Sequence, residues 1–187
     1  LKFLIIEGSK ERKLAGEYVI DVAEYHRFSD AQDDQSITYF QLKHSTKRLD
    51  TPFVLSGLKG TIEGFSDRYS NLTGSTKKSH SFNFTIVTNR PVCKKFKDNI
   101  QNIANECKVD KRFKDTLERY TKLSDSALVQ FCSLLSFEDG EGNYLNQKYE
   151  LHAELSELLA GVVDNTQVDS IIALVAERAL PDNQGEI

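Results

Sequence analysis

The chain has 187 residues, of which 39% are hydrophobic and 28% are charged, and its formal net charge is −4. These values are typical of a water-soluble globular protein with one domain, or with one domain and a helical appendage. No apolar run approaches the roughly 18 residues of a membrane-spanning helix and no signal peptide is visible, so we expect a cytoplasmic protein without membrane contact.

Charge is distributed unevenly along the chain. Residues 1–100 carry 16 Lys and Arg against 12 Asp and Glu (net +4), whereas residues 101–187 carry 8 against 16 (net −8). The first part therefore suits a polyanionic partner better than the second part does, although ordinary variation in surface charge explains the same numbers.

The cysteines indicate the redox compartment of the protein, and the first residue indicates whether the natural start is present. The three cysteines, Cys93, Cys107 and Cys132, are widely spaced, which suits a reducing compartment and gives no zinc-binding pattern. The sequence begins at Leu1 and contains no methionine, so we expect a fragment whose natural start is missing.

The first part of the chain predicts three strands. Residues 1–8 are an apolar run closed by glycine, and residues 18–26 and 37–45 are rich in β-branched and aromatic residues. The ten-residue polar loop between the second and third runs predicts a long hairpin. We therefore expect three neighbouring antiparallel strands.

A helix and a fourth strand follow. Apolar residues near helical spacing predict a helix over residues 51–72, with Thr51 as N-cap and Pro52 in the first turn, although three glycines weaken this prediction. The helix is long enough for a crossover to a parallel strand over residues 82–89. The remaining predicted elements are helices over residues 90–108, 112–123, 125–137, 148–161 and 165–180. The expected fold class is α/β, with a mixed sheet flanked by helices.

Polar side chains interrupt the predicted hairpin. Alternation places Gln41 and Lys43 on one face of the third strand, and Asp21 shares a face with apolar neighbours in the second. Because burial of an unpaired charge is costly, these groups need partners. Pairing of the two strands would bring the three side chains together near one end of the hairpin, where Glu7 could join them from the end of the first strand.

Two interpretations of this cluster follow from the residue types. In the first, Asp21 and Lys43 form a salt bridge at a half-exposed edge of the sheet. In the second, Asp21, Glu7 and the side-chain carbonyl of Gln41 bind Mg²⁺ or Mn²⁺, since hard divalent cations prefer oxygen ligands. Lys43 would then assist a metal-bound water or balance the charge of a scissile phosphate.

The order of these residues resembles a known nuclease pattern. Glu7, Asp21 and Gln41-x-Lys43 on three successive strands, followed by a helix and a strand, resemble the PD-(D/E)xK nuclease superfamily. The glutamine variant is similar to its Mrr-like and Cap4-like branches. More closely, "IDVAEY…YFQLKHS", a helix, "FTIVTNRP" and a helical tail resemble the double-stranded DNA endonuclease domain of Cap4-type bacterial anti-phage effectors.

The resemblance implies a restriction-endonuclease-like fold and a domain division. Residues 1–110 would form the nuclease core, without the first helix of the family, and residues 111–187 a helical extension packed on the core. It also implies metal-dependent hydrolysis of DNA phosphodiester bonds with little sequence specificity. The domain would be the effector of an antiviral defence protein with an attached sensor module. Assembly into a homo-oligomer is one alternative that the resemblance leaves undecided.

The resemblance also assigns roles residue by residue. Asp21 would be the metal-binding acid, Gln41 the second ligand position and Lys43 the catalytic lysine, with Glu7 as a further metal ligand. Basic residues near strand ends are candidates for contacts with DNA phosphates. These residues are Lys47, Arg48, Lys77, Lys78 and Arg90.

Two other functions remain open on the sequence alone. Gln41 in place of an acid removes one metal-binding charge, so the alternative is a catalytically inactive nuclease-fold module that binds nucleic acid or a partner protein. A third interpretation is a helical interaction domain in which the sheet has only a structural role. It predicts that Lys43→Ala leaves every activity unchanged.

Overall fold

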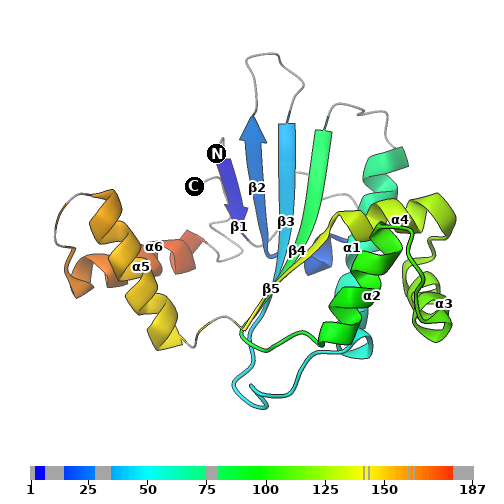
Figure 1. Ribbon diagram of the computed structural model, residues 1–187. Helices are drawn as coiled ribbons and strands as arrows, with labels where there is room; N and C mark the ends of the chain where they lie inside the picture. The colour runs from blue at the N-terminus through cyan, green and yellow to red at the C-terminus, as the bar shows by residue number, and fades with distance from the viewer. Residues whose placement is uncertain are drawn as a thin grey trace.

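A mixed β-sheet forms the centre of the protein (Figure 1). The computed structural model describes residues 3–6, 15–27, 35–74, 80–140, 142, 144–159, 161 and 163–178. Within these residues the sheet has five strands in the order β1-β2-β3-β4-β5. The strands are β1 (Phe3–Ile6), β2 (Val22–Arg27), β3 (Gln35–Lys43), β4 (His80–Thr88) and β5 (Leu135–Asp139). β1, β2 and β3 are antiparallel neighbours, and β4 and β5 continue the sheet in parallel with β3.

Helices flank this sheet, as the sequence predicts. They are α1 (Lys59–Gly74), α2 (Lys94–Ala104), α3 (Lys111–Thr121), α4 (Asp125–Ser133), α5 (Tyr144–Leu158) and α6 (Asn165–Arg178), with short 3-10 helices η1 (Glu17–Val19) and η2 (Leu55–Leu58). In Figure 1, α1 to α4 gather at the β4 and β5 side, and α5 and α6 form a separate pair beyond the opposite side. None of the helices in the described part of the chain is long and apolar enough to cross a bilayer.

The main core lies between the sheet and α1. Tyr39 and Phe84, on neighbouring strands, stack with ring centroids 5.6 Å apart, and Phe65 of α1 lies 5.0 Å from Phe84. Alternate strand residues point into this core, as the period-two pattern predicts. The fully or almost fully buried hydrophobic strand residues are Ala23, Tyr25, Ile37, Tyr39, Phe84 and Ile86. The alternation predicted for β3 is therefore confirmed.

The expected second strand begins later than predicted. Residues 17–19 form η1 instead, and β2 starts at Val22. Gly16 adopts a positive φ of 79° and packs against the carbonyl of Gly64 in α1, while Val19 packs against Gly64 itself. This close contact with α1 turns the chain before β2 can begin, and no local sequence pattern reveals it.

The helix expected over residues 51–72 also begins later. Phe53 forms a parallel bridge with Val92, in which Phe53 N donates to Pro91 O (2.8 Å) and Cys93 N donates to Phe53 O (2.8 Å). These bonds hold residues 51–54 outside the helix, so α1 starts at Lys59 after η2. Thr51 and Pro52 therefore do not cap the helix as predicted.

The helix expected over residues 125–137 is wrong in its last part. α4 ends at Ser133, and Leu135–Asp139 form β5, which pairs in parallel with β4. Phe84 N donates to Leu134 O (2.9 Å), so the unpaired edge of β4 recruits this segment. The sheet therefore continues beyond residue 110, and residues 111–187 are not wholly helical.

Candidate active site

Asp21 lies one residue before β2 and opposite Gln41 of β3. Asp21 N donates to Phe40 O (2.9 Å), although Phe40 is the register partner of Val22, so this bond holds Asp21 beside β3 outside the regular pairing. In return, Leu42 N donates to Asp21 Oδ2 (2.6 Å), and Gln41 Nε2 donates to the same oxygen. The carboxylate is thus held against β3 by a backbone and a side-chain donor, and the predicted meeting of Asp21 and Gln41 is confirmed.

Gln41 and Lys43 lie where the buried face of β3 reaches the end of the strand. Gln41 is only 7% exposed and follows the fully buried Tyr39 on this face, and Lys43 is half-buried. Leu42, on the other face, is 49% exposed. Asp21 and Lys43 form no ion pair with each other or with any other described residue, so the salt-bridge interpretation is wrong.

The donor set at Asp21 and Gln41 fits a hard cation in its chemistry. Since Gln41 uses its Nε2 to bind Asp21 Oδ2, Asp21 Oδ1 and Gln41 Oε1 remain, and no described residue donates a hydrogen bond to either oxygen. Mg²⁺ is commonly bound by one or two protein oxygens and several waters. The described residues contain no group of three His, Cys, Asp or Glu side chains that could hold a metal, and Glu7 lies outside them.

Asp139 is a carboxylate at the same end of the sheet that the sequence analysis did not single out. It ends β5, in register with Thr88 of β4 and through it with Lys43 of β3. Lys97 Nζ donates to its Oδ1 (2.8 Å) and Val92 N to its Oδ2 (2.6 Å). Burial raises the pKa of Asp139, but these two bonds and the positive charge of Lys97 together contribute to a pKa that is lowered overall.

The position of Asp139 separates it from the Asp21 cluster. Three strand spacings lie between β2 and β5, about 14 Å in all, which is too far for the two carboxylates to bind one metal ion. Asp139 instead ties the segment before α2, and α2 itself, to the sheet. The missed sequence signal is the alternation of apolar and polar residues over 135–138, which matches the alternating burial of β5.

Side-chain bonds also fix the ends of β3 and β4. Asn89 acts like an extra pair of backbone groups, since its Nδ2 donates to Ser45 O (2.8 Å) and its Oδ1 accepts from Ser45 N (2.9 Å). Thr88 Oγ1 accepts from Arg90 N (3.1 Å). These bonds hold the strand end that carries Lys43 in a fixed position relative to β4.

The candidate DNA-binding residues differ in their contacts and exposure. Arg90 donates from Nε (2.9 Å) and Nη2 (2.5 Å) to Thr51 O, and its guanidinium lies 3.9 Å from the ring centroid of Phe53. It therefore has a structural role in holding the segment after β3. Lys47 and Arg48 are exposed in that same segment. Lys77 and Lys78 lie outside the described residues.

A buried ion pair supports the segment that leads to Asp21. Arg68 of α1 is completely buried, its guanidinium lies 5.4 Å from the ring centroid of Tyr39, and it donates to Glu17 of η1. This pair was not predicted from the sequence. Its signal is an arginine three residues after Phe65, on the apolar stripe of α1.

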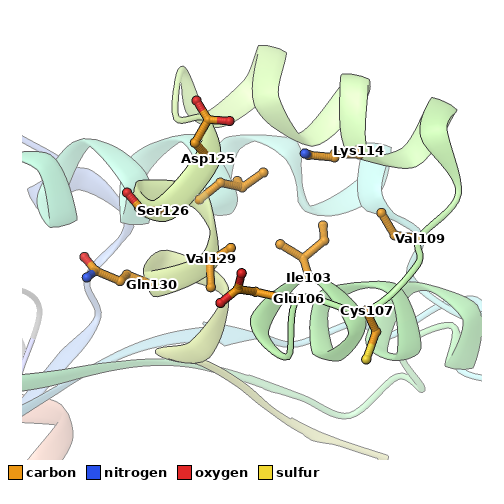
Figure 2. Close-up of a pocket in the computed structure, with 10 residues that line it drawn as sticks. Ile103, Glu106, Cys107, Val109, Lys114, Asp125, Ser126, Val129 and Gln130 are labelled. Atoms are coloured by element: carbon orange, nitrogen blue, oxygen red, sulfur yellow. The ribbon is translucent and has the colours of Figure 1, made fainter.

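The hollow shown in Figure 2 lies elsewhere. It has a volume of about 560 Å³, lies between α2, α3 and α4, and has Ile103, Leu128 and Val129 among its apolar lining residues and Glu106 and Asp125 at exposed positions. α2 begins near the end of β4 that carries Thr88, and its 11 residues carry the chain about 16 Å from there. This hollow is therefore not part of the Asp21 cluster.

Comparison with known proteins does not place the chain in a family. No protein-family model matches it, and a search of curated proteins found no matching sequence. What the chain does must therefore be argued from the geometry of its own residues.

Proposed function

We propose that this chain is a metal-dependent endonuclease domain of the PD-(D/E)xK type that hydrolyses DNA phosphodiester bonds with little sequence specificity. One observation carries the proposal. Asp21 and Gln41 meet at one end of the β2–β3 pair, where Gln41 Nε2 and Leu42 N bind the Asp21 carboxylate, and Lys43 follows two residues after Gln41 on the same face of β3. The further assignment as effector domain of an anti-phage defence protein, attached to a sensor module, is supported by the sequence resemblance alone.

Each residue of the cluster has a distinct role in this proposal. Asp21 Oδ1 and Gln41 Oε1 would hold the Mg²⁺ or Mn²⁺ ion. The bound ion would supply an activated water and neutralise charge on the phosphate. Gln41 also fixes the orientation of the Asp21 carboxylate through its bond to Oδ2. Lys43 places a compact positive charge on the same face, where it offsets the charge of a scissile phosphate.

DNA contact in this proposal depends on charge rather than on base recognition. Lys47 and Arg48 follow Lys43 directly in the chain and are exposed. Contacts from such residues to phosphates bind all sequences similarly and weaken steeply as salt rises. We therefore expect cleavage that tolerates sequence and is inhibited by moderate salt.

Plasmid cleavage tests the proposal. Wild-type protein is incubated with supercoiled plasmid and Mg²⁺ or Mn²⁺, beside Lys43→Ala and Asp21→Asn. Asp21→Asn keeps an acceptor for Leu42 N while it removes the charge. Lys108→Ala, at an exposed position between α2 and α3, is the matched control. We expect wild type and Lys108→Ala to cut, and both site variants to lose at least about 100-fold in rate. Equal rates for all four proteins would refute the assignment.

Thermal unfolding gives a second readout that needs no cleavage. Mg²⁺ or Mn²⁺ should raise the Tm of wild type and of the exposed control Asp50→Asn but not that of Asp21→Asn, because a ligand that binds only the folded state stabilises it. Salt-dependent DNA binding without metal binding or cleavage would favour the catalytically inactive module instead.

A further inference from the structure

A second hollow lies beside the chain segments that follow β3 and β4. It has a volume of about 340 Å³ and lies between residues 54–56, α2 and α3. The bridge between Phe53 and Val92 joins these two segments directly beside the lining residues Val54 and Cys93.

The hollow contains a buried polar side chain without a partner. Asn99 of α2 is only 6% exposed and lines the hollow, yet its side chain makes no hydrogen bond to any residue in the described part of the chain. Its amide atoms are not among the completely enclosed side-chain atoms that lack a partner, so they remain accessible from the hollow that Asn99 lines. The amide offers one acceptor oxygen and two N–H donors side by side. It is therefore available to pair with a ligand.

Aromatic rings and basic side chains line the hollow around Asn99. Phe96 is almost completely buried, and Phe113 of α3 lies beside it, half-buried, with ring centroids 5.8 Å apart. At the rim, Lys95 pairs with Asp110 (3.2 Å), whereas the exposed Arg112 forms no ion pair with any described residue. A ligand that matches these features has an apolar face, a polar edge with adjacent donor and acceptor, and an anionic group.

We propose that this hollow binds the base of a nucleoside monophosphate. The Asn99 amide pairs with the base edge, the Phe113 ring contacts the face of the base, and Arg112 binds the phosphate. Adenine is the best match, since asparagine pairs through two bonds with its adjacent amino group and ring nitrogen. The volume of about 340 Å³ is near the lower limit of small-molecule sites, which suits one nucleotide rather than a dinucleotide.

The larger hollow of Figure 2 does not offer the same recognition. Its charged residues, Glu106 and Asp125, lie at exposed positions, and the side chain of Gln130 already accepts a hydrogen bond from Tyr69 (3.0 Å). The nucleotide proposal does not depend on the nuclease proposal, because it uses neither Asp21 nor Lys43.

Calorimetric titration with AMP tests the proposal. The variants are Asn99→Leu and its matched control Asn102→Leu, which makes the same change one turn further along α2 at a position that does not line the hollow. We expect AMP to bind wild type and Asn102→Leu, and to bind Asn99→Leu at least about tenfold more weakly. Arg112→Ala should weaken AMP binding and leave adenosine binding unchanged.

Three results would overturn the proposal. The first is no binding of AMP, GMP, CMP or UMP to wild type. The second is equal AMP affinity for wild type and Asn99→Leu. The third is equal binding of ribose 5-phosphate and AMP, which would show that the base is not recognised. Weaker AMP binding by Asn99→Leu should not result from unfolding. Replacement of an unpartnered amide by leucine should leave the Tm of the free protein equal or higher. Thermal unfolding of the variant checks this.

Discussion

The contact between η1 and α1 gives the sharpest stability prediction. Gly64 lies in α1 directly beneath Val19 of η1, the segment that leads to Asp21. A Cβ atom at position 64 would lie 2.7 Å from Val19 Cγ1 and closer still to Cγ2. Carbon atoms in contact prefer separations of about 3.5–4.0 Å, so η1 would have to retreat by roughly 1 Å. We therefore predict that Gly64→Ala destabilises the protein.

The size of the effect follows from two opposing terms. Replacement of glycine by alanine inside a helix gains about 1 kcal/mol, whereas overpacking of a tight contact costs about 1–3 kcal/mol. η1 cannot retreat easily, because Gly16 is itself packed against α1 and Glu17 is bound to the buried Arg68. The overpacking cost should therefore lie in the upper part of its range, about 2–3 kcal/mol, and the expected net loss is then about 1–2 kcal/mol. A loss of this size lowers the Tm of a chain of this length by about 2–8 °C.

A control variant in the same helix should change the free energy of unfolding in the opposite direction. A Cβ atom at Gly60 meets nothing within 4 Å, so Gly60→Ala should stabilise by about 1 kcal/mol. Urea unfolding of both variants measures the two free energies. In the double variant Val19→Ala/Gly64→Ala, the loss should be smaller than the sum of the two single losses, because the clash is removed. If Gly64→Ala were as stabilising as Gly60→Ala, the close contact of η1 with α1 would not exist.

Two further predictions concern charged groups. Glu17→Ala should cost about 3 kcal/mol in unfolding free energy, because it leaves the buried Arg68 guanidinium without this carboxylate, and Glu17→Ala/Arg68→Leu should recover much of that loss in urea unfolding. If the double variant recovered none of the lost unfolding free energy, this account of the ion pair would be contradicted. Asp139 has a pKa lowered from its ordinary 3.8 by bonds from Lys97 and Val92, so its contribution is complete above that value and is lost as pH falls through the lower folded-state pKa. The stability of wild type should therefore fall more steeply below about pH 4 than that of Asp139→Asn, and equal slopes in unfolding experiments over this range would refute the prediction.

The polar cluster could be predicted from the sequence because strand alternation is a local property. Asp21, Gln41 and Lys43 are assigned to one face by counting residues, and hairpin pairing then brings Asp21 opposite Gln41. Which groups bond could not be predicted. Alternation gives only the face, and the choice of Leu42 N and Gln41 rather than Lys43 as partners of Asp21 depends on distances within the turn before β2.

The amino-acid pattern by itself thus determined the antiparallel strands, the crossover to β4 and the buried face of the sheet, since these follow from hydrophobic periodicity within short segments. Only the tertiary structure decided where β5 lies, where η1 turns and which buried polar groups have partners. β5 forms because the edge of β4 needs hydrogen-bond partners, and η1 forms because Gly16 and Gly64 let two segments approach closely. Asn99 stands out only once the helix around it is packed, because a missing partner is a property of three-dimensional surroundings and not of sequence.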